Sequence, residues 1–206
     1  MNQSSFEQLQ QEVKASRKSE YPIHPMFLNR WSPRAFSSKE VDPDALMSIF
    51  EAACWAPSGG NLQPWRYIIA RNEQDKLKFK SFINEGNWNW CQHAPVLALL
   101  TVQTTRGDNK PNRTAMLDAG ASWACLALEA MHQGLITHAM GGFQPVLAKE
   151  VLDIPDDYEC CIVIAIGYRG DKDQLAEKDR SREFPSTRRP FKQSLYEGKF
   201  GQAIDL

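Results

Sequence analysis

The sequence lacks any strong imbalance of charge. Its 206 residues carry 24 Lys and Arg against 25 Asp and Glu, which gives a formal net charge of −1. Without a broad positive field, the chain as a whole is not attracted to nucleic acid or to an anionic membrane, so neither partner is expected. Basic residues that take part in binding must therefore act locally.

Long apolar runs and paired cysteine motifs are also missing. The longest apolar run, APVLALLTV at residues 94–102, is too short to cross a bilayer, and residues 1–20 lack the apolar centre of a signal peptide. The cysteines are odd in number and show no C-x-x-C spacing, and three histidines have no acidic or cysteine partner at metal-ligand spacing. We therefore expect buried thiols, a soluble cytoplasmic protein and no metal site. The cysteines are Cys54, Cys91, Cys125, Cys160 and Cys161, and the three histidines are His24, His93 and His132.

Three common catalytic motifs are absent as well. The chain has no P-loop, no G-x-G-x-x-G and no nucleophile elbow, which leaves kinase, classical Rossmann and hydrolase interpretations without a residue basis. It has no internal repeat, and its length fits one domain with a full core.

Hydrophobic periodicity predicts alternating helices and strands. Two apolar runs of strand length are typical of central strands covered on both faces, and helices on both faces of a sheet imply a three-layer sandwich of the α+β or α/β class. The segment 84–93 has no clear period and is expected to be a loop. Helices are predicted at 5–18, 42–56, 73–83, 113–133 and 144–152, and strands at 65–70, 94–102 and 160–168.

A charged segment follows the last strand. Residues 169–190 contain few apolar side chains, so a compact monomer would hold them poorly. We expect that another surface fixes the end of this segment.

The most informative stretch is PSGGNLQPW at residues 57–65, which joins a predicted helix to a predicted strand. Its two glycines allow the backbone to approach a flat ligand closely, and Ser58, Asn61 and Gln63 offer hydrogen-bond donors and acceptors. These features are typical of a ligand-binding loop.

This loop resembles a P-S-x-x-N-x-Q-P-W segment of the nitroreductase family of FMN-dependent oxidoreductases. Three further stretches are similar to family motifs and occur in the family order: RWSPRAF at 30–36, GLITHAMGGF at 134–143 and STRRPF at 186–191. The resemblance implies an α-β-α sandwich and an intertwined homodimer with FMN at the subunit interface. It also implies one domain over 1–206, with a helical N-terminal extension over 1–24 and a C-terminal extension over 169–206 that crosses to the partner.

The resemblance assigns the phosphate of FMN to Arg30, Ser32 and Arg188, with Arg189 as the substitute if the late motif is shifted by one residue. A planar guanidinium suits a phosphate because it meets two oxygens at once. Trp31 stands where the family commonly has Arg or His, so only its backbone would contact the phosphate or ribityl chain.

Arg34 has a catalytic role in this comparison. The resemblance puts it near flavin N1 and the C2 carbonyl, where negative charge collects on reduction, so that a fixed cation would favour the reduced ring.

The same resemblance assigns the remaining contacts with the flavin ring. Asn61 would meet its polar edge, Gln63 belongs to the same flavin-binding loop, and Pro57 and Ser58 would run beside the ring. A backbone N–H among Met140, Gly141 and Gly142 would lie near N5. Many family members have Glu where this chain has Gly141. An alternative interpretation of Asn61 is that it only tolerates the turn.

The reaction implied is a ping-pong transfer of hydride from NADH or NADPH through FMN to a small electron-poor acceptor such as a nitroaromatic or a quinone. Three alternatives stay open: another reaction on the same fold (dehalogenation, enone reduction or dehydrogenation), a flavin sensor without turnover, and an interaction protein that binds no flavin. His138 could donate a proton to the substrate or be purely structural.

Overall fold

The computed structural model describes residues 8–107 and 109–205, and it divides the chain into two compact units. One unit combines the two ends of the chain, up to Asn29 and from Phe184 onward, and the other spans Arg30–Glu183.

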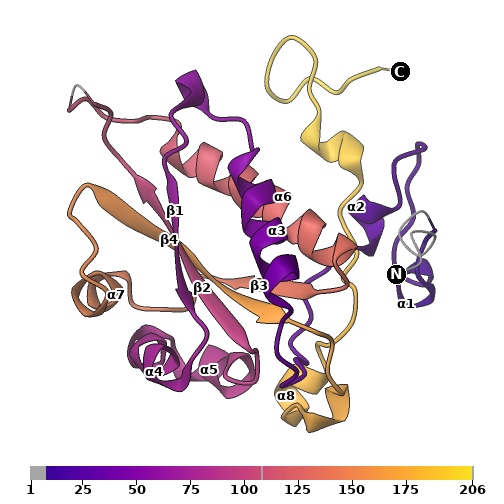
Figure 1. The fold of residues 1–206 in the computed structure, drawn as a ribbon. Helices are drawn as coiled ribbons and strands as arrows, with labels where there is room; N and C mark the ends of the chain where they lie inside the picture. The colour runs from indigo at the N-terminus through magenta and orange to yellow at the C-terminus, as the bar shows by residue number, and fades with distance from the viewer. Residues whose placement is uncertain (1–7, 108, 206) are drawn as a thin grey trace. The chain divides into compact units, whose positions relative to one another are not determined.

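The larger unit is built on a four-stranded antiparallel sheet with strand order β1-β2-β4-β3 (Figure 1). An antiparallel sheet with helices identifies the fold as α+β rather than α/β, which decides between the two classes left open by the sequence. The strands are β1 Trp65–Ala70, β2 Val96–Gln103, β3 Ile136–Met140 and β4 Tyr158–Gly167. Strand β3 lies within a stretch for which we predicted only a motif.

Helices cover both faces of the sheet, as the two apolar runs predict. Helices α3 (Pro43–Cys54) and α6 (Ala115–His132) lie on one face, and α4 (Glu73–Phe82), α5 (Glu85–Cys91) and α7 (Pro145–Val151) lie on the other (Figure 1). Side chains of β2 enter the two cores alternately, which explains why this strand has no polar face. The shorter helices are α1 Gln11–Lys14, α2 Met26–Asn29 and α8 Glu177–Arg180, with 3-10 turns at Gly59–Asn61, Lys172–Gln174 and Phe191–Ser194. No helix among the described residues is both long and apolar enough to span a membrane.

Local signals predicted several boundaries well. Asp42 caps α3 by accepting the N–H groups of Asp44 and Ala45, and Pro43 is the first helical residue. Gly134, with φ of +74°, follows the end of α6, where its N–H bonds to the carbonyl oxygen of Met131.

The N-terminal helix is much shorter than the prediction of 5–18. Residues 5–7 lie outside the described part, and of the others only Gln11–Lys14 are helical. The physical reason is that Asn29 competes for the backbone: its Oδ1 accepts the N–H of Gln10, and its Nδ2 donates to the carbonyl oxygen of Gln8, both at 2.9 Å.

Two other expectations were wrong. The predicted loop at 84–93 contains α5, which forms because Trp90 and Cys91 are buried in the core against α4 and the sheet. The five cysteines are unpaired, but only Cys91 is fully buried, and Cys54 is exposed near the end of α3. The other three lie at half-buried positions.

The first part of the charged segment after β4 is held more firmly than predicted. Arg169 forms an antiparallel bridge with Phe36, and the N–H of Gly170 donates to the carbonyl oxygen of Ala35 at 2.8 Å. A side chain at Gly170 would meet the backbone of Phe36 at 2.5 Å, so this close pairing requires glycine. The segment around residue 35 therefore pairs with the chain just beyond the end of β4.

Candidate functional site

The segment Arg30–Phe36 brings together the first group of predicted site residues. Arg30 Nη1 lies 3.4 Å from Ser32 Oγ, so these two predicted phosphate ligands are adjacent. The backbone of this segment is fixed at Ser37, whose N–H donates to the carbonyl oxygen of Tyr168 at 2.9 Å.

Arg34 lies in a mostly buried position among charged and aromatic groups. Its side chain is 16% exposed, and its Nε atom is 4.0 Å from a carboxylate oxygen of Asp179 in α8. Its guanidinium is 5.9 Å from the ring centre of Trp90. Burial lowers the pKa of Arg34, and the nearby charge of Arg182 lowers it further, whereas the carboxylates of Asp179 and Glu183 oppose this. A guanidinium remains charged in this environment, so Arg34 is a fixed cation.

His138 packs against the same group. Its ring centre is 4.5 Å from that of Trp90, and its Nδ1 atom is 3.0 Å from the carbonyl oxygen of Pro33. Burial lowers the pKa of His138 to about 4, and the hydrogen bond with Pro33 only partly opposes this effect. The imidazole is therefore neutral at pH 7, and because a carbonyl only accepts, Nδ1 carries the proton. This geometry favours the structural role of His138 over proton donation to a substrate.

The Met140–Gly142 segment ends β3 and meets the start of α5. The carbonyl oxygen of Gly142 accepts hydrogen bonds from the backbone N–H of Asn84 and from Nδ2 of Asn87, both at 3.1 Å. A Cβ atom at Gly142 would lie 2.4 Å from Asn87 Nδ2, whereas a Cβ atom at Gly141 would have nothing within 4 Å. The sequence analysis missed Asn84 and Asn87 because residues 84–93 were predicted to be a loop. The signal for a helix start here was Asn84 directly before Glu85.

The loop 57–64 has an unusual backbone. Gly60, Asn61 and Gln63 all have positive φ, at 59°, 55° and 47°. Gln63 secures this conformation, because its N–H donates to Ser58 Oγ at 3.0 Å and its Nε2 donates to both oxygens of Asn61 at 3.1 Å. A non-glycine residue with positive φ costs free energy and persists where surrounding contacts enforce it, often at ligand sites.

Helix α6 holds the other side of this loop. Asp118, which is 4% exposed, accepts the N–H of Gly59 at 3.2 Å and the hydroxyl of Thr114 at 3.1 Å. A Cβ atom at Gly59 would be 2.4 Å from Thr114 Oγ1, so the loop approaches the helix closely. The sequence analysis did not single out Asp118, which lies in the first turn of α6.

The loop and the Arg30–Phe36 segment lie at opposite ends of the sheet. Trp65, which follows the loop, pairs with Val102, and Val102 pairs with Glu159 at the start of β4. Phe36 instead pairs with Arg169, beyond the other end of β4. Ten residues of extended chain separate these two positions, which corresponds to roughly 30 Å. Figure 1 shows the loop above the upper end of β1, and α8, whose Asp179 lies beside Arg34, below the sheet.

The late motif belongs to the unit formed by the chain ends. There, Arg188 Nη1 donates to Ser186 Oγ and to the carbonyl oxygen of Thr187, both at 3.0 Å. Arg17 is buried and donates to the carbonyl oxygens of Ser186 and Leu28, both at 2.8 Å.

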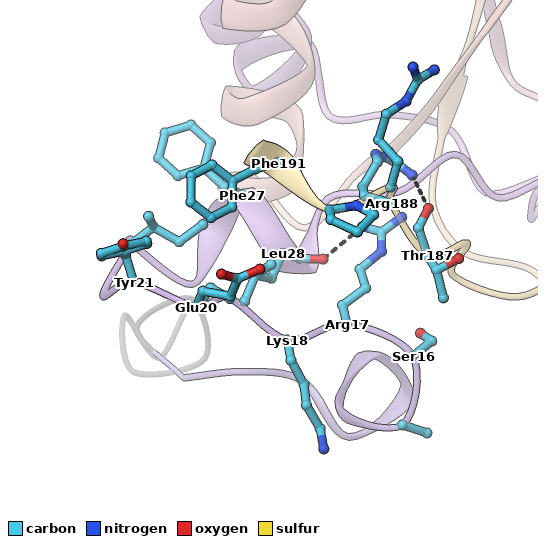
Figure 2. Close-up of a pocket in the computed structure, with 15 residues that line it drawn as sticks. Ser16, Arg17, Lys18, Glu20, Tyr21, Phe27, Leu28, Thr187, Arg188 and Phe191 are labelled. Carbon is cyan, nitrogen blue, oxygen red and sulfur yellow. Dashed lines mark hydrogen bonds between the residues drawn. The ribbon is translucent and has the colours of Figure 1, made fainter. Parts of the chain in front are cut away.

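A pocket of about 800 Å³ opens in this unit. Aromatic side chains of Tyr21, Phe27 and Phe191 gather on one side of it, and Arg17 and Arg188 lie on the other (Figure 2). Both Arg188 and Arg189, the two alternatives for the late phosphate ligand, line the pocket.

Comparisons with known proteins agree with the motifs. The model of the nitroreductase family matches residues 28–89 and 82–168. A putative NADH dehydrogenase/NAD(P)H nitroreductase of Streptomyces coelicolor is 26% identical over 165 residues, which cover 69% of this chain and 81% of that protein.

Solved structures share the fold. A crystal structure described as an oxidoreductase containing FMN has a TM-score of 0.86 and 39% identity, covering 90% of this chain and 96% of that one. The enone reductase CLA-ER of gut-bacterial fatty acid metabolism has a TM-score of 0.65 and 21% identity, covering 71% of this chain and 88% of that one. At that identity the second similarity concerns the fold alone.

Proposed function

Since this chain belongs to the nitroreductase family, we propose that it is an FMN-dependent oxidoreductase that uses NADH or NADPH to reduce small electron-poor molecules, and that it acts as a homodimer. The observation that carries the proposal is that the Arg30–Phe36 segment and the loop 57–64 adjoin opposite ends of one sheet, with roughly 30 Å of extended strand between the positions of Phe36 and Trp65. We therefore assign Arg30, Ser32 and Arg34 of one chain and the loop 57–64 of a second chain to the same proposed site.

The residues of the first group suit the cofactor chemically. Arg30 and Ser32 offer adjacent donors for a phosphate dianion, and Arg34 offers a fixed cation for a ring edge that becomes negative on reduction. Gly141 has open space where a Cβ atom would lie, which would allow a flat ring to approach the backbone.

The loop of the second chain would supply the remaining polar contacts. Its Asn61 and Gln63 side chains are joined to each other and exposed, so the loop is preorganised before any ligand arrives. When bound, FMN would supply the hydride chemistry. The chain itself would bind and orient the cofactor, and Arg34 would stabilise the charge on its reduced form.

Exposed apolar side chains support the homodimer. Trp55 after α3 is 82% exposed, and Met116 and Leu117 at the start of α6 are 55% and 74% exposed. Large apolar side chains gathered near two adjacent helix ends are typical of a surface that another protein covers. Both helix ends lie near the loop 57–64, where a second chain would have to approach.

The proposal is tested by subunit complementation. Arg30→Ala should remove the phosphate ligand and Asn61→Ala the loop contact, so each homodimer should lose most of its FMN. A heterodimer purified with two different tags after co-expression has one site with both changes and one with neither. It should recover about half of the FMN and of the NAD(P)H oxidation rate.

The control is a heterodimer of wild type with a chain that carries both changes on one polypeptide. Both of its sites contain one altered group, so it should recover neither FMN nor activity. Equal FMN content in the two heterodimers, or a monomeric wild type that takes up no FMN, would refute the proposal. Anaerobic titration of the yellow protein with NADH and NADPH separately would then identify the donor.

A further inference from the structure

Glu183 is a buried carboxylate beside the segment that contains Arg30, Ser32 and Arg34. Its side chain is 0% exposed. It accepts the backbone N–H of Arg34 at 2.8 Å and that of Ala35 at 3.1 Å. Hydrogen bonds to a charged acceptor are about twice as strong as neutral ones, so this carboxylate fixes the orientation of two consecutive peptide groups.

Glu183 reaches the same segment a second time through Arg169. Arg169 Nη2 lies 3.4 Å from Glu183 Oε1, and the guanidinium of Arg169 lies over the ring of Trp31, 4.4 Å from its centre. A cation over an aromatic face is attracted by the ring electrons. One carboxylate therefore holds the segment at the backbone of residues 34 and 35 and, through Arg169, at the side chain of Trp31.

The surrounding charges explain why this carboxylate is stable in a buried position. Arg169 pairs with it directly, and Arg34 lies close enough for the two charges to interact. A buried charge that keeps its partners is tolerated, whereas removal of one partner leaves the other uncompensated.

From these contacts we infer that Glu183 is a positioning residue for the cofactor segment. It holds residues 31–35 in the conformation from which Arg30, Ser32 and Arg34 would meet the phosphate and ring of FMN. The inference rests on the proposed function, and it assigns Glu183 no contact with the cofactor itself.

The test uses Glu183→Gln, which preserves shape but removes the charge and one acceptor oxygen. The apoprotein is expected to bind FMN at least tenfold more weakly, measured by flavin fluorescence. Amide hydrogen exchange should accelerate at Arg34 and Ala35 while the β2 amides stay protected. FMN affinity within twofold of wild type would overturn the inference.

Two controls separate positioning from general effects. Glu177→Gln changes an exposed carboxylate in α8 that is paired with Arg180, and it should leave FMN affinity within twofold. Phe79→Leu should lower stability from within the core without removing any hydrogen bond or ion pair of Glu183, and it should also leave FMN affinity within twofold. Loss of FMN affinity in Phe79→Leu equal to that in Glu183→Gln would overturn the inference, because stability alone would then explain both.

Arg169→Gln keeps the test decisive if Glu183→Gln does not fold. The side chain of Arg169 is 34% exposed, so its replacement should be tolerated. It removes the contact with Trp31 and the charge partner of Glu183, but it leaves the carboxylate of Glu183 on the backbone of residues 34 and 35. We expect FMN affinity to fall about threefold to tenfold, and unchanged affinity would overturn the inference. A wild-type protein that takes up no FMN would instead refute the proposed function.

Discussion

His138 Nδ1 lies 3.0 Å from the carbonyl oxygen of Pro33, which joins β3 to the segment that contains the candidate phosphate ligands. The imidazole is also packed against Trp90. This single contact connects two of the four motifs that were singled out in the sequence.

The contact predicts a loss of stability in acid. The pKa of His138 is lowered from 6.5 to about 4 in the folded chain, so the unfolded chain binds the proton more readily. The contribution of His138 to the free energy of unfolding is therefore fully present above pH 6.5, and it is lost as the pH falls toward 4. Between pH 7 and pH 5 the free energy of unfolding should fall by roughly 2 kcal/mol. Urea denaturation at the two pH values measures this.

His138→Asn is the matched variant for that measurement. The Asn amide can donate to the carbonyl oxygen of Pro33 as Nδ1 does, but it does not titrate. The variant should lose most of the difference in unfolding free energy between pH 7 and pH 5. An unchanged difference would show that other groups cause the acid sensitivity.

Arg34→Ala should lower the reduction potential of the bound flavin, because a fixed cation near the ring favours its reduced form. A tenfold preference for the reduced form corresponds to about 30 mV for a two-electron couple, so we expect a decrease of at least this size. Photoreduction with a reference dye measures the potential. As a control, Arg71→Ala removes an exposed cation just after β1 and should leave the reduction potential unchanged. An unchanged potential in Arg34→Ala would contradict the electrostatic role of Arg34.

Gly142→Ala should destabilise the fold, since the new Cβ atom would lie 2.4 Å from Asn87 Nδ2. Displacement of Asn87 would break its bond to the carbonyl oxygen of Gly142, at a cost of about 1–3 kcal/mol. Gly141→Ala meets open space and should change the free energy of unfolding by less than about 0.5 kcal/mol. Asn87→Ala combined with Gly142→Ala should recover part of the loss, and equal stability of the two glycine variants would contradict the steric argument.

Asp118→Ala should release the loop 57–64 from α6. The N–H of Gly59 and the hydroxyl of Thr114 would both lose a buried acceptor, which should lower the unfolding free energy by about 1–3 kcal/mol. Hydrogen exchange at Gly59 should accelerate, and FMN content should fall. Asp44→Ala, at an exposed position in α3, is the control. Unchanged exchange at Gly59 in Asp118→Ala would show that other contacts hold the loop.

The sequence predicted those parts of the fold that depend on local physics. Pro43 and Gly134 marked helix ends because their backbone preferences act within one turn. The helix at 5–18 failed because a side chain distant in sequence, Asn29, takes the hydrogen bonds of Gln8 and Gln10. Helix α5 was missed because its short, polar sequence is stabilised by the burial of Trp90 and Cys91 rather than by periodicity.

In the candidate site, too, local motifs could be predicted and contacts between residues distant in sequence could not. Motif residues such as Arg30, Ser32 and Asn61 could be named from their pattern. Glu183 and Asp118, which hold those motifs in place, belong to no pattern, and only the folded chain brings them to Arg34 and Gly59. Whether the named residues bind flavin stays a prediction for the experiments above.

The length of β4 has a consequence for how the protein would respond to its environment. Because β4 holds the Arg30–Phe36 segment and the loop 57–64 apart within one polypeptide, a cofactor molecule that contacts both would bridge the two chains of the proposed homodimer. Such a ligand promotes association by mass action. Scarcity of riboflavin phosphate would then lower the fraction of assembled protein as well as the fraction that is active, and dilution would release cofactor and subunits together.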